Sequence, residues 1–188
     1  MKLFLSSLAI SDSQSVELAR LIGKEPSTIS LALIENAADT YGEAERAWVY
    51  INRAAIQSHG FAVELVDLRE YNKRPALIKA MLRTKDIVWF GGGNSFYLRW
   101  LLKDTGIDAI LKELVVKGLV YGGGSAGAII AGPTLKHFEL PMILMMLQRL
   151  YMAAWPSLRR WWCRMPTTPN LHQSSQASLP SCKLTVTK

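Results

Sequence analysis

The segment Val120–Gly132, "VYGGGSAGAIIAG", joins an apolar, β-rich run to a cluster of glycines and then to small helix-forming residues. Its centre, Gly123–Gly127, fits the pattern G-x-S-x-G, in which a serine occupies a sharp turn between a strand and a helix. Small residues must flank that serine because the turn is tight. The pattern predicts that Ser125 lies above the end of a buried strand. It leaves two interpretations open, an activated serine or one small residue in a glycine-rich turn.

The chain on the N-terminal side of this segment alternates between two kinds of pattern. Apolar, β-rich runs predict strands at residues 2–7, 28–35, 61–68, 86–90 and 119–123. Helical spacing predicts helices at residues 13–23, 41–60, 74–84, 95–106 and 108–118. Near-continuous apolar strands separated by helices indicate an α/β fold, a mostly parallel sheet with helices on both faces. In such folds ligands bind beyond the carboxyl ends of the strands.

A second glycine cluster, residues 91–94 ("GGGN"), follows the strand predicted at residues 86–90. Taken alone, it predicts only a strand-to-helix turn with Asn94 or Ser95 as N-cap. Two glycine clusters at the ends of buried strands favour a joint site instead. A Walker phosphate loop is disfavoured because no Lys-Ser/Thr follows the glycines. A dinucleotide fingerprint is disfavoured because the Ser125 cluster lies late in the chain, without the acidic residue expected downstream.

The formal net charge of +7 does not predict a nucleic-acid partner, because its distribution is uneven. Residues 1–139 contain 16 basic and 15 acidic residues, whereas residues 140–188 contain six basic residues and no acidic one. The body is therefore nearly neutral and carries a basic tail rather than a basic face. The apolar start is too short for a secretory signal, and no stretch predicts a membrane span, so we expect a cytoplasmic protein without a membrane partner. Cys163 and Cys182 match no zinc spacing, and neither a metal nor an organic cofactor is expected.

The two glycine motifs together resemble a known family. "VWFGGGNSFYLRWLL" (residues 88–102) followed by "YGGGSAGAIIAGPT" (residues 121–134) is similar to the dipeptidase E family of serine peptidases, relatives of the cyanophycinases. The resemblance covers residues 1–139. It implies a flavodoxin-like fold similar to class I glutamine amidotransferases, and an activity that cleaves small peptides, typically dipeptides with an N-terminal aspartate.

The resemblance also implies roles for individual residues. Ser125 would be the nucleophile, and the backbone N–H groups of Gly93 and Ala126 would form the oxyanion hole. Asn94, which follows the glycines directly, is a candidate substrate contact. No cofactor is implied, and the expected partner is a small peptide substrate.

A serine hydroxyl needs a base to become a nucleophile, and histidine is the usual one. The resemblance implies a histidine in a Pro-His pair well downstream of the serine, and this chain has no such pair. Of its three histidines, His59 precedes the helix-ending Gly60 and is expected to interact with the helix C-terminus. His172 lies in a polar stretch and is expected to be solvated. His137 is therefore the remaining candidate base.

The composition changes after Glu139. The last 49 residues contain no Gly, Asp or Glu, yet they hold both cysteines and five of the seven methionines. A shifted frame, in which each codon consists of the third base of one codon and the first two bases of the next, encodes a different amino-acid sequence. Met and Trp have single codons, so some residues of this shifted frame are fixed. The codon that spans Met142 and Ile143 must encode Asp, and the codons that begin with the last base of Trp161 and of Trp162 must encode Val. Permitted choices then spell Pro-His, with the histidine codon straddling Arg164 and Met165.

We therefore hypothesise that one base was lost near codon 140 and that residues 140–188 are translated out of frame. The predicted organisation is a serine-peptidase-like domain, residues 1–139, and an altered tail, residues 140–188, with the C-terminal part of the family fold missing. One side of the sheet would then be uncovered, which predicts poor stability or a homo-oligomer that buries it through residues 140–155. Two alternatives remain: a genuine basic or membrane-adhering tail, and a catalytically dead family member that retains a small-molecule or peptide pocket.

Overall fold

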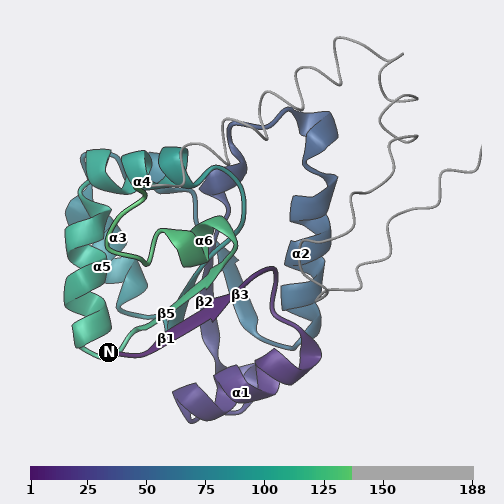
Figure 1. The fold of residues 1–188 in the computed structure, drawn as a ribbon. Helices are drawn as coiled ribbons and strands as arrows, with labels where there is room; N and C mark the ends of the chain where they lie inside the picture. The colour runs from purple at the N-terminus through teal and green to yellow at the C-terminus, as the bar shows by residue number, and fades with distance from the viewer. Residues whose placement is uncertain (137–188) are drawn as a thin grey trace, which may run out of the picture. The chain divides into compact units, whose positions relative to one another are not determined.

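Five parallel strands form a single sheet in the computed structural model, which describes residues 1–136 (Figure 1). The strands are β1 (Leu3–Ser6), β2 (Ser30–Ile34), β3 (Ala62–Leu65), β4 (Ile87–Phe90) and β5 (Val120–Gly124). Their order across the sheet is β1-β5-β4-β2-β3, and every neighbouring pair is parallel. The predicted α/β fold with a parallel sheet is confirmed, and each strand lies within its predicted run except β5, which extends one residue further, to Gly124.

Helices cover both faces of the sheet, as predicted. They are α1 (Asp12–Ile22), α2 (Ala47–Ser58), α3 (Pro75–Leu82), α4 (Ser95–Asp104), α5 (Ile107–Val116) and α6 (Ala126–Ile129). Because side chains alternate along a strand, β4 contributes Val88 and Phe90 to one core and Ile87 and Trp89 to the other. The first core contains residues of α3, α4, α5 and α6, and the second contains residues of α1 and α2.

The predicted helix at residues 41–60 is shorter in the structure. A 3-10 turn, η3 (Glu43–Glu45), precedes α2, which begins only at Ala47. The cause is the Arg46 side chain, whose Nε donates to the carbonyl of Tyr41 at 3.0 Å and whose Nη2 donates to that of Asp39 at 3.2 Å. These two bonds hold the preceding segment as a loop beside the sheet instead of a first helical turn.

The strand β1 lies at an edge of the sheet and pairs with β5. Leu3 is 43% exposed and Leu5 is 48% exposed, which is high for large apolar side chains in a strand. Within residues 1–136 nothing pairs with the outer edge of β1. The predicted change of character at residue 140 and the predicted oligomer contact through residues 140–155 both lie outside the described residues.

The carboxyl end of β2 is where the sheet can hold a ligand. After β2 the chain passes to α2 on one face, whereas after its neighbours β3 and β4 it passes to α3 and α4 on the other. Connections that leave adjacent strands on opposite faces open a crevice beyond the strand ends. The glycine cluster after β4 follows the strand next to β2, and the cluster after β5 lies one strand further along the sheet.

Candidate active site

The two glycine-rich turns lie side by side. The strands that precede them, β4 and β5, are paired, with Phe90 opposite Gly123. After the strands, the N–H of Gly127 donates to the carbonyl of Gly91 at 3.2 Å. The expectation that the two clusters meet at one edge of the sheet is therefore confirmed.

Ser125 has the backbone conformation of a strained turn. Its φ of 50° and ψ of −110° are unusual for a residue with a side chain, and it is one of two such positive-φ residues in the described part of the chain. It caps the N-terminus of α6, and its own N–H donates to the carbonyl of Ser6 at 3.0 Å. Strain of this kind costs about 1–3 kcal/mol and persists only where the surroundings enforce it. Here the β1 carbonyl and the start of α6 hold Ser125 half-buried above β5.

The glycines on either side of Ser125 allow α6 to pack directly on the strands. A Cβ added to Gly123 would lie 2.4 Å from the carbonyl carbon of Gly127, and one added to Gly127 would lie 2.2 Å from the carbonyl oxygen of Phe90. Both distances are impossible for real atoms. The G-x-S-x-G spacing is thus a packing requirement of this turn, and it places the helix N-terminus beside the Ser125 hydroxyl.

The turn after β4 faces Ser125 across this junction. A Cβ on Gly92 would lie 3.7 Å from Ser125 Oγ, which places the Gly92 backbone beside the hydroxyl. Gly93 has a φ of 135°, and its position leaves no room for a side chain because a Cβ would lie 2.2 Å from the carbonyl oxygen of Ala37. Within residues 1–136, no backbone carbonyl accepts a hydrogen bond from the N–H of Gly93 or of Ala126. Both groups are therefore available as donors to a ligand.

Asn94 serves as the N-cap of α4. Its Oδ1 accepts hydrogen bonds from the N–H groups of Phe96 and Tyr97, each at 3.0 Å, and its own N–H donates to the Ala37 carbonyl at 2.7 Å. Asn94 rather than Ser95 is the cap. Its role as a substrate contact stays a prediction, and that contact would have to use the Nδ2 group because Oδ1 is occupied.

The histidine within the described residues has partners other than Ser125. Nε2 of His59 lies 2.8 Å from the carbonyl oxygen of Ile10, and Nδ1 lies 3.6 Å from Asp12. His59 is the C-cap residue of α2, and its side chain is 7% exposed. Its predicted position at the helix end is confirmed, but its side chain contacts the segment at the start of α1 instead of the C-terminus of α2. The candidate base His137 lies outside the described residues, as does His172.

Two aromatic residues near Ser125 were not anticipated from the sequence. The ring of Trp48, on the first turn of α2, lies 3.5 Å from where a Gly92 Cβ would be. Tyr41 packs edge-on against Trp48 with ring centroids 5.9 Å apart. Only the tertiary position of α2 brings these residues to the glycine turn, so no sequence pattern could have identified them.

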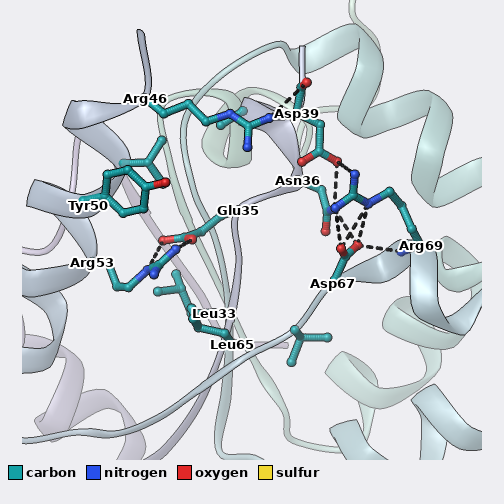
Figure 2. Close-up of a pocket in the computed structure, with 13 residues that line it drawn as sticks. Leu33, Glu35, Asn36, Asp39, Arg46, Tyr50, Arg53, Leu65, Asp67 and Arg69 are labelled. Atoms are coloured by element: carbon teal, nitrogen blue, oxygen red, sulfur yellow. Dashed lines mark hydrogen bonds and ion pairs between the residues drawn. The ribbon is translucent and has the colours of Figure 1, made fainter. Parts of the chain in front are cut away.

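A cavity of about 210 Å³ lies at the carboxyl ends of β2 and β3 (Figure 2). Its lining comprises Leu33, Glu35, Asn36, Ala38, Asp39, Arg46, Val49, Tyr50, Arg53, Leu65, Val66, Asp67 and Arg69. Figure 2 shows Arg46 and Arg53 reaching in from α2, with Asp67 and Arg69 on the opposite wall. Polar residues shortly after β2 and β3, among them Glu35 and Asp67, were the signal in the sequence for this cavity.

A hydrogen-bond network fixes the wall of the cavity nearest the glycine turn. Nδ2 of the buried Asn36 donates to Asp39 and to Asp67, each at 2.9 Å, and its Oδ1 accepts from the N–H of Leu68 at 3.0 Å. Arg69 makes a forked contact with Asp67, at 2.9 Å and 2.5 Å. The Arg69 hydrogen bond, aided by Asn36 and opposed by burial, lowers the pKa of Asp67 to about 2. The network thereby anchors the segment that contains Ala37 and supports Gly93.

Asp67→Asn is expected to lower the free energy of unfolding by about 1–2 kcal/mol at pH 7, with the loss disappearing between pH 4 and pH 2. A carboxyl whose folded pKa is lowered stabilises the protein above its unfolded pKa and ceases to do so as pH falls through the folded value. Urea unfolding at several pH values measures the difference. Arg69→Gln removes the hydrogen-bond donor that lowers the pKa of Asp67, so it should also reduce the stability gained between pH 2 and pH 4. A difference in unfolding free energy between Asp67→Asn and the parent protein that stays constant with pH would contradict the low pKa of Asp67.

Among residues 1–136, no three His, Cys, Asp or Glu side chains lie together in a way that could hold a metal ion. Nor does any helix there have the length and apolar character needed to cross a membrane.

The fold and the site together define an α/β protein with a strained serine between a buried parallel strand and a helix, opposite a second glycine turn. The sequence model of peptidase family S51 matches residues 15–144, so the chain belongs to this family. The resemblance to dipeptidase E expected from the glycine motifs is confirmed.

Individual relatives agree with this assignment. The chain is 34% identical over 92 residues to the uncharacterized peptidase Lmo0363 of Listeria monocytogenes, and this match covers 49% of this chain and 44% of that protein. It is 46% identical over 65 residues to peptidase E of Streptomyces coelicolor, and this match covers 34% of this chain and 27% of that protein. The chain thus spans less than half of the length of these curated relatives.

A solved structure is also similar. A crystal structure of a protein assigned to peptidase E from Listeria monocytogenes matches with a TM-score of 0.61 and 27% identity, covering 74% of this chain and 66% of that one. A peptidase from an acI-B1 actinobacterium matches with a TM-score of 0.52 and 20% identity, which shows a shared fold.

Proposed function

We propose that this chain carries the nucleophilic half of a serine peptidase that cleaves small peptides, among them dipeptides with an N-terminal aspartate, through an acyl-enzyme at Ser125. The observation that carries the proposal is the geometry of Ser125. A serine in a strained turn, at a helix N-terminus and beside a second glycine turn, is placed for attack on a carbonyl bound between the two turns.

The chemistry follows from this arrangement. Oγ of Ser125 attacks the scissile carbonyl carbon as its proton passes to a base, and the carbonyl oxygen becomes an oxyanion. The N–H groups of Gly93 and Ala126 are the proposed donors to that oxyanion, which the N-terminus of α6 also favours. The C–N bond then breaks, and the protonated base gives its proton to the leaving amine. Water, activated by the same base, releases the acid from Ser125.

The base is the part of this mechanism that the described residues do not supply. We propose that it was lost with the reading frame near codon 140, so that this chain is impaired. The match to the peptidase family ends at residue 144, which supports this position for the change. The alternative is a family member without catalysis that still binds a peptide or another small molecule at the same strand ends.

A fluorophosphonate probe tests the role of Ser125. The chain as it stands is expected to react slowly, because no histidine of the described residues adjoins Ser125, and the adduct is expected on Ser125 alone. Ser125→Ala should abolish labelling, whereas Ser27→Ala, at an exposed position before β2, should leave it unchanged. Intact-protein mass spectrometry followed by peptide mapping measures both. Rapid labelling would point to a complete triad and contradict the impairment, and labelling that survives Ser125→Ala would contradict the assignment of the nucleophile.

A further inference from the structure

We propose that Tyr121 is a positioning residue of the oxyanion hole: its buried hydroxyl holds the carbonyl of Gly127 and thereby fixes the N–H of Ala126. This inference rests on the proposed peptidase function, in which that N–H is a donor to the oxyanion. Tyr121 lies on β5, the strand that leads to Ser125, and it acts through the backbone of α6 rather than on the substrate.

The ring of Tyr121 has a fixed place in the core. The residue is 8% exposed and belongs to the core that contains α4, α5 and α6. In the sheet it pairs with Val88 of β4 on one side and with Leu3 of β1 on the other. Its ring stacks on that of Phe90, with ring centroids 5.1 Å apart and an angle of 22° between the planes. The hydroxyl is therefore held in one place relative to the strand end.

The hydroxyl of Tyr121 replaces a missing hydrogen bond of α6. It donates to the carbonyl oxygen of Gly127 at 2.7 Å, in a buried contact. In a longer helix that carbonyl would accept from the N–H of Ala131, but α6 ends at Ile129 and the Ala131 N–H donates to Ala128 at 3.3 Å. Burial raises the pKa of Tyr121, so the hydroxyl stays a neutral donor at neutral pH.

Three hydrogen bonds together hold the backbone on both sides of Ala126. After it, the N–H of Gly127 donates to the carbonyl of Gly91 at 3.2 Å, while the carbonyl of Gly127 accepts from Tyr121. Before it, the N–H of Ser125 donates to a carbonyl of β1 at 3.0 Å. The direction of the Ala126 N–H is set by these anchors. A donor that is aimed in advance stabilises an oxyanion without reorganising during the reaction.

The packing around Tyr121 does not by itself account for the hydroxyl. A phenylalanine would fill the same space and stack on Phe90 in the same way. A buried hydroxyl costs free energy unless it is hydrogen-bonded, so its contribution here lies in the bond to Gly127. We therefore assign the hydroxyl to holding the turn that carries Ala126.

The rate at which a fluorophosphonate labels Ser125 in the full chain tests this role, because the phosphoryl oxygen of the probe takes the place of the oxyanion. Tyr121→Phe removes the hydroxyl and keeps the ring. We expect the maximal labelling rate to fall about fivefold to twentyfold, less than the loss of an entire oxyanion donor. The probe concentration that gives half of the maximal rate should stay unchanged, because the variant leaves the binding surface intact.

Thr105→Val is the matched control. Thr105 is 7% exposed, and its hydroxyl donates to the carbonyl of Leu101 at 2.6 Å, at the end of α4 that lies away from the glycine turn. This variant also removes one buried hydroxyl bound to a backbone carbonyl, and it should leave the labelling rate unchanged. An equal fall in both variants would indicate a general loss of stability and overturn the proposal. An unchanged rate in Tyr121→Phe would overturn it as well.

Hydrogen exchange of the Gly127 amide, followed by NMR, tests the proposal without any reaction at Ser125. This amide should exchange slowly in the parent protein and about threefold to tenfold faster in Tyr121→Phe, with no change in Thr105→Val. Fast exchange in the parent would overturn the proposal even if Tyr121→Phe does not fold, and so would equal exchange in the parent and Tyr121→Phe. A parent protein that is never labelled at Ser125 would contradict the proposed function, and the exchange rates would then decide the role of Tyr121.

Discussion

Insertion of a single nucleotide near codon 140 is expected to raise hydrolysis of a small peptide by about 10⁴–10⁶-fold over the present chain. The inserted base leaves residues 1–139 unchanged and restores the shifted reading, in which Met142 and Ile143 yield Asp and Trp161 and Trp162 yield Val. Where the codons of Cys163 and Arg164 end in C, that reading contains a Pro-His pair after a valine run, and its histidine is the proposed base for Ser125. The effect is large because an unactivated serine hydroxyl is a poor nucleophile at neutral pH.

The nucleotide sequence of the gene tests the frame hypothesis before any protein is made. Pro-His requires that the codon of Cys163 end in C and that the codon of Arg164 end in C. The shifted frame must also remain open beyond codon 188. A coding sequence with other bases at these positions would rule out the frame hypothesis, and the tail would then be genuine.

Kinetic controls separate the restored base from other effects of the insertion. Three nucleotides inserted at the same place keep the present frame and should give no increase. Ser125→Ala in the restored protein should return hydrolysis to the level of the present chain. A restored protein that folds but gains no activity would favour the alternative of a binding protein without catalysis.

The parts of the structure that were predictable from sequence are those in which local chemistry admits few solutions. Gly123 and Gly127 are needed because backbone atoms pack directly against backbone atoms on both sides of Ser125, so these glycines in the sequence indicate the close packing. The apolar runs of β2 and β4 predicted these strands for a similar reason, since a strand covered on both faces has few polar positions. Asn94 was recognisable as a cap because its short side chain follows a turn and precedes a helix.

Other features depended on contacts between distant segments. The start of α2 was placed too early because Arg46 bonds to carbonyls in its own preceding loop and prevents a first helical turn. The network beneath Gly93 joins Asn36 to Asp67, which are far apart in the sequence and meet only because β2 pairs with β3. No periodicity indicates such a pairing, so the residues that line the cavity at the ends of β2 and β3 could be brought together only once the strand order was known.

Gly93→Ala is expected to destabilise the protein by about 3 kcal/mol or more, from two independent causes. Gly93 has a φ of 135°, a conformation that side-chain-bearing residues rarely adopt, and a methyl group there would lie 2.2 Å from the Ala37 carbonyl oxygen. The Asn36 network fixes that carbonyl, so the clash cannot be relieved by moving the loop alone. Urea unfolding followed by circular dichroism measures the loss.

Gly118→Ala provides the matched control for backbone strain. Gly118 has a φ of 117°, and nothing lies within 4 Å of the position that a Cβ would occupy. Only the conformational cost should therefore apply, about 1–2 kcal/mol. The additional loss of unfolding free energy in Gly93→Ala then measures how firmly the Ala37 segment holds the glycine turn beside Ser125. Equal losses at the two positions would show that this segment yields, and the Gly93 N–H would then not be a preorganised donor to an oxyanion.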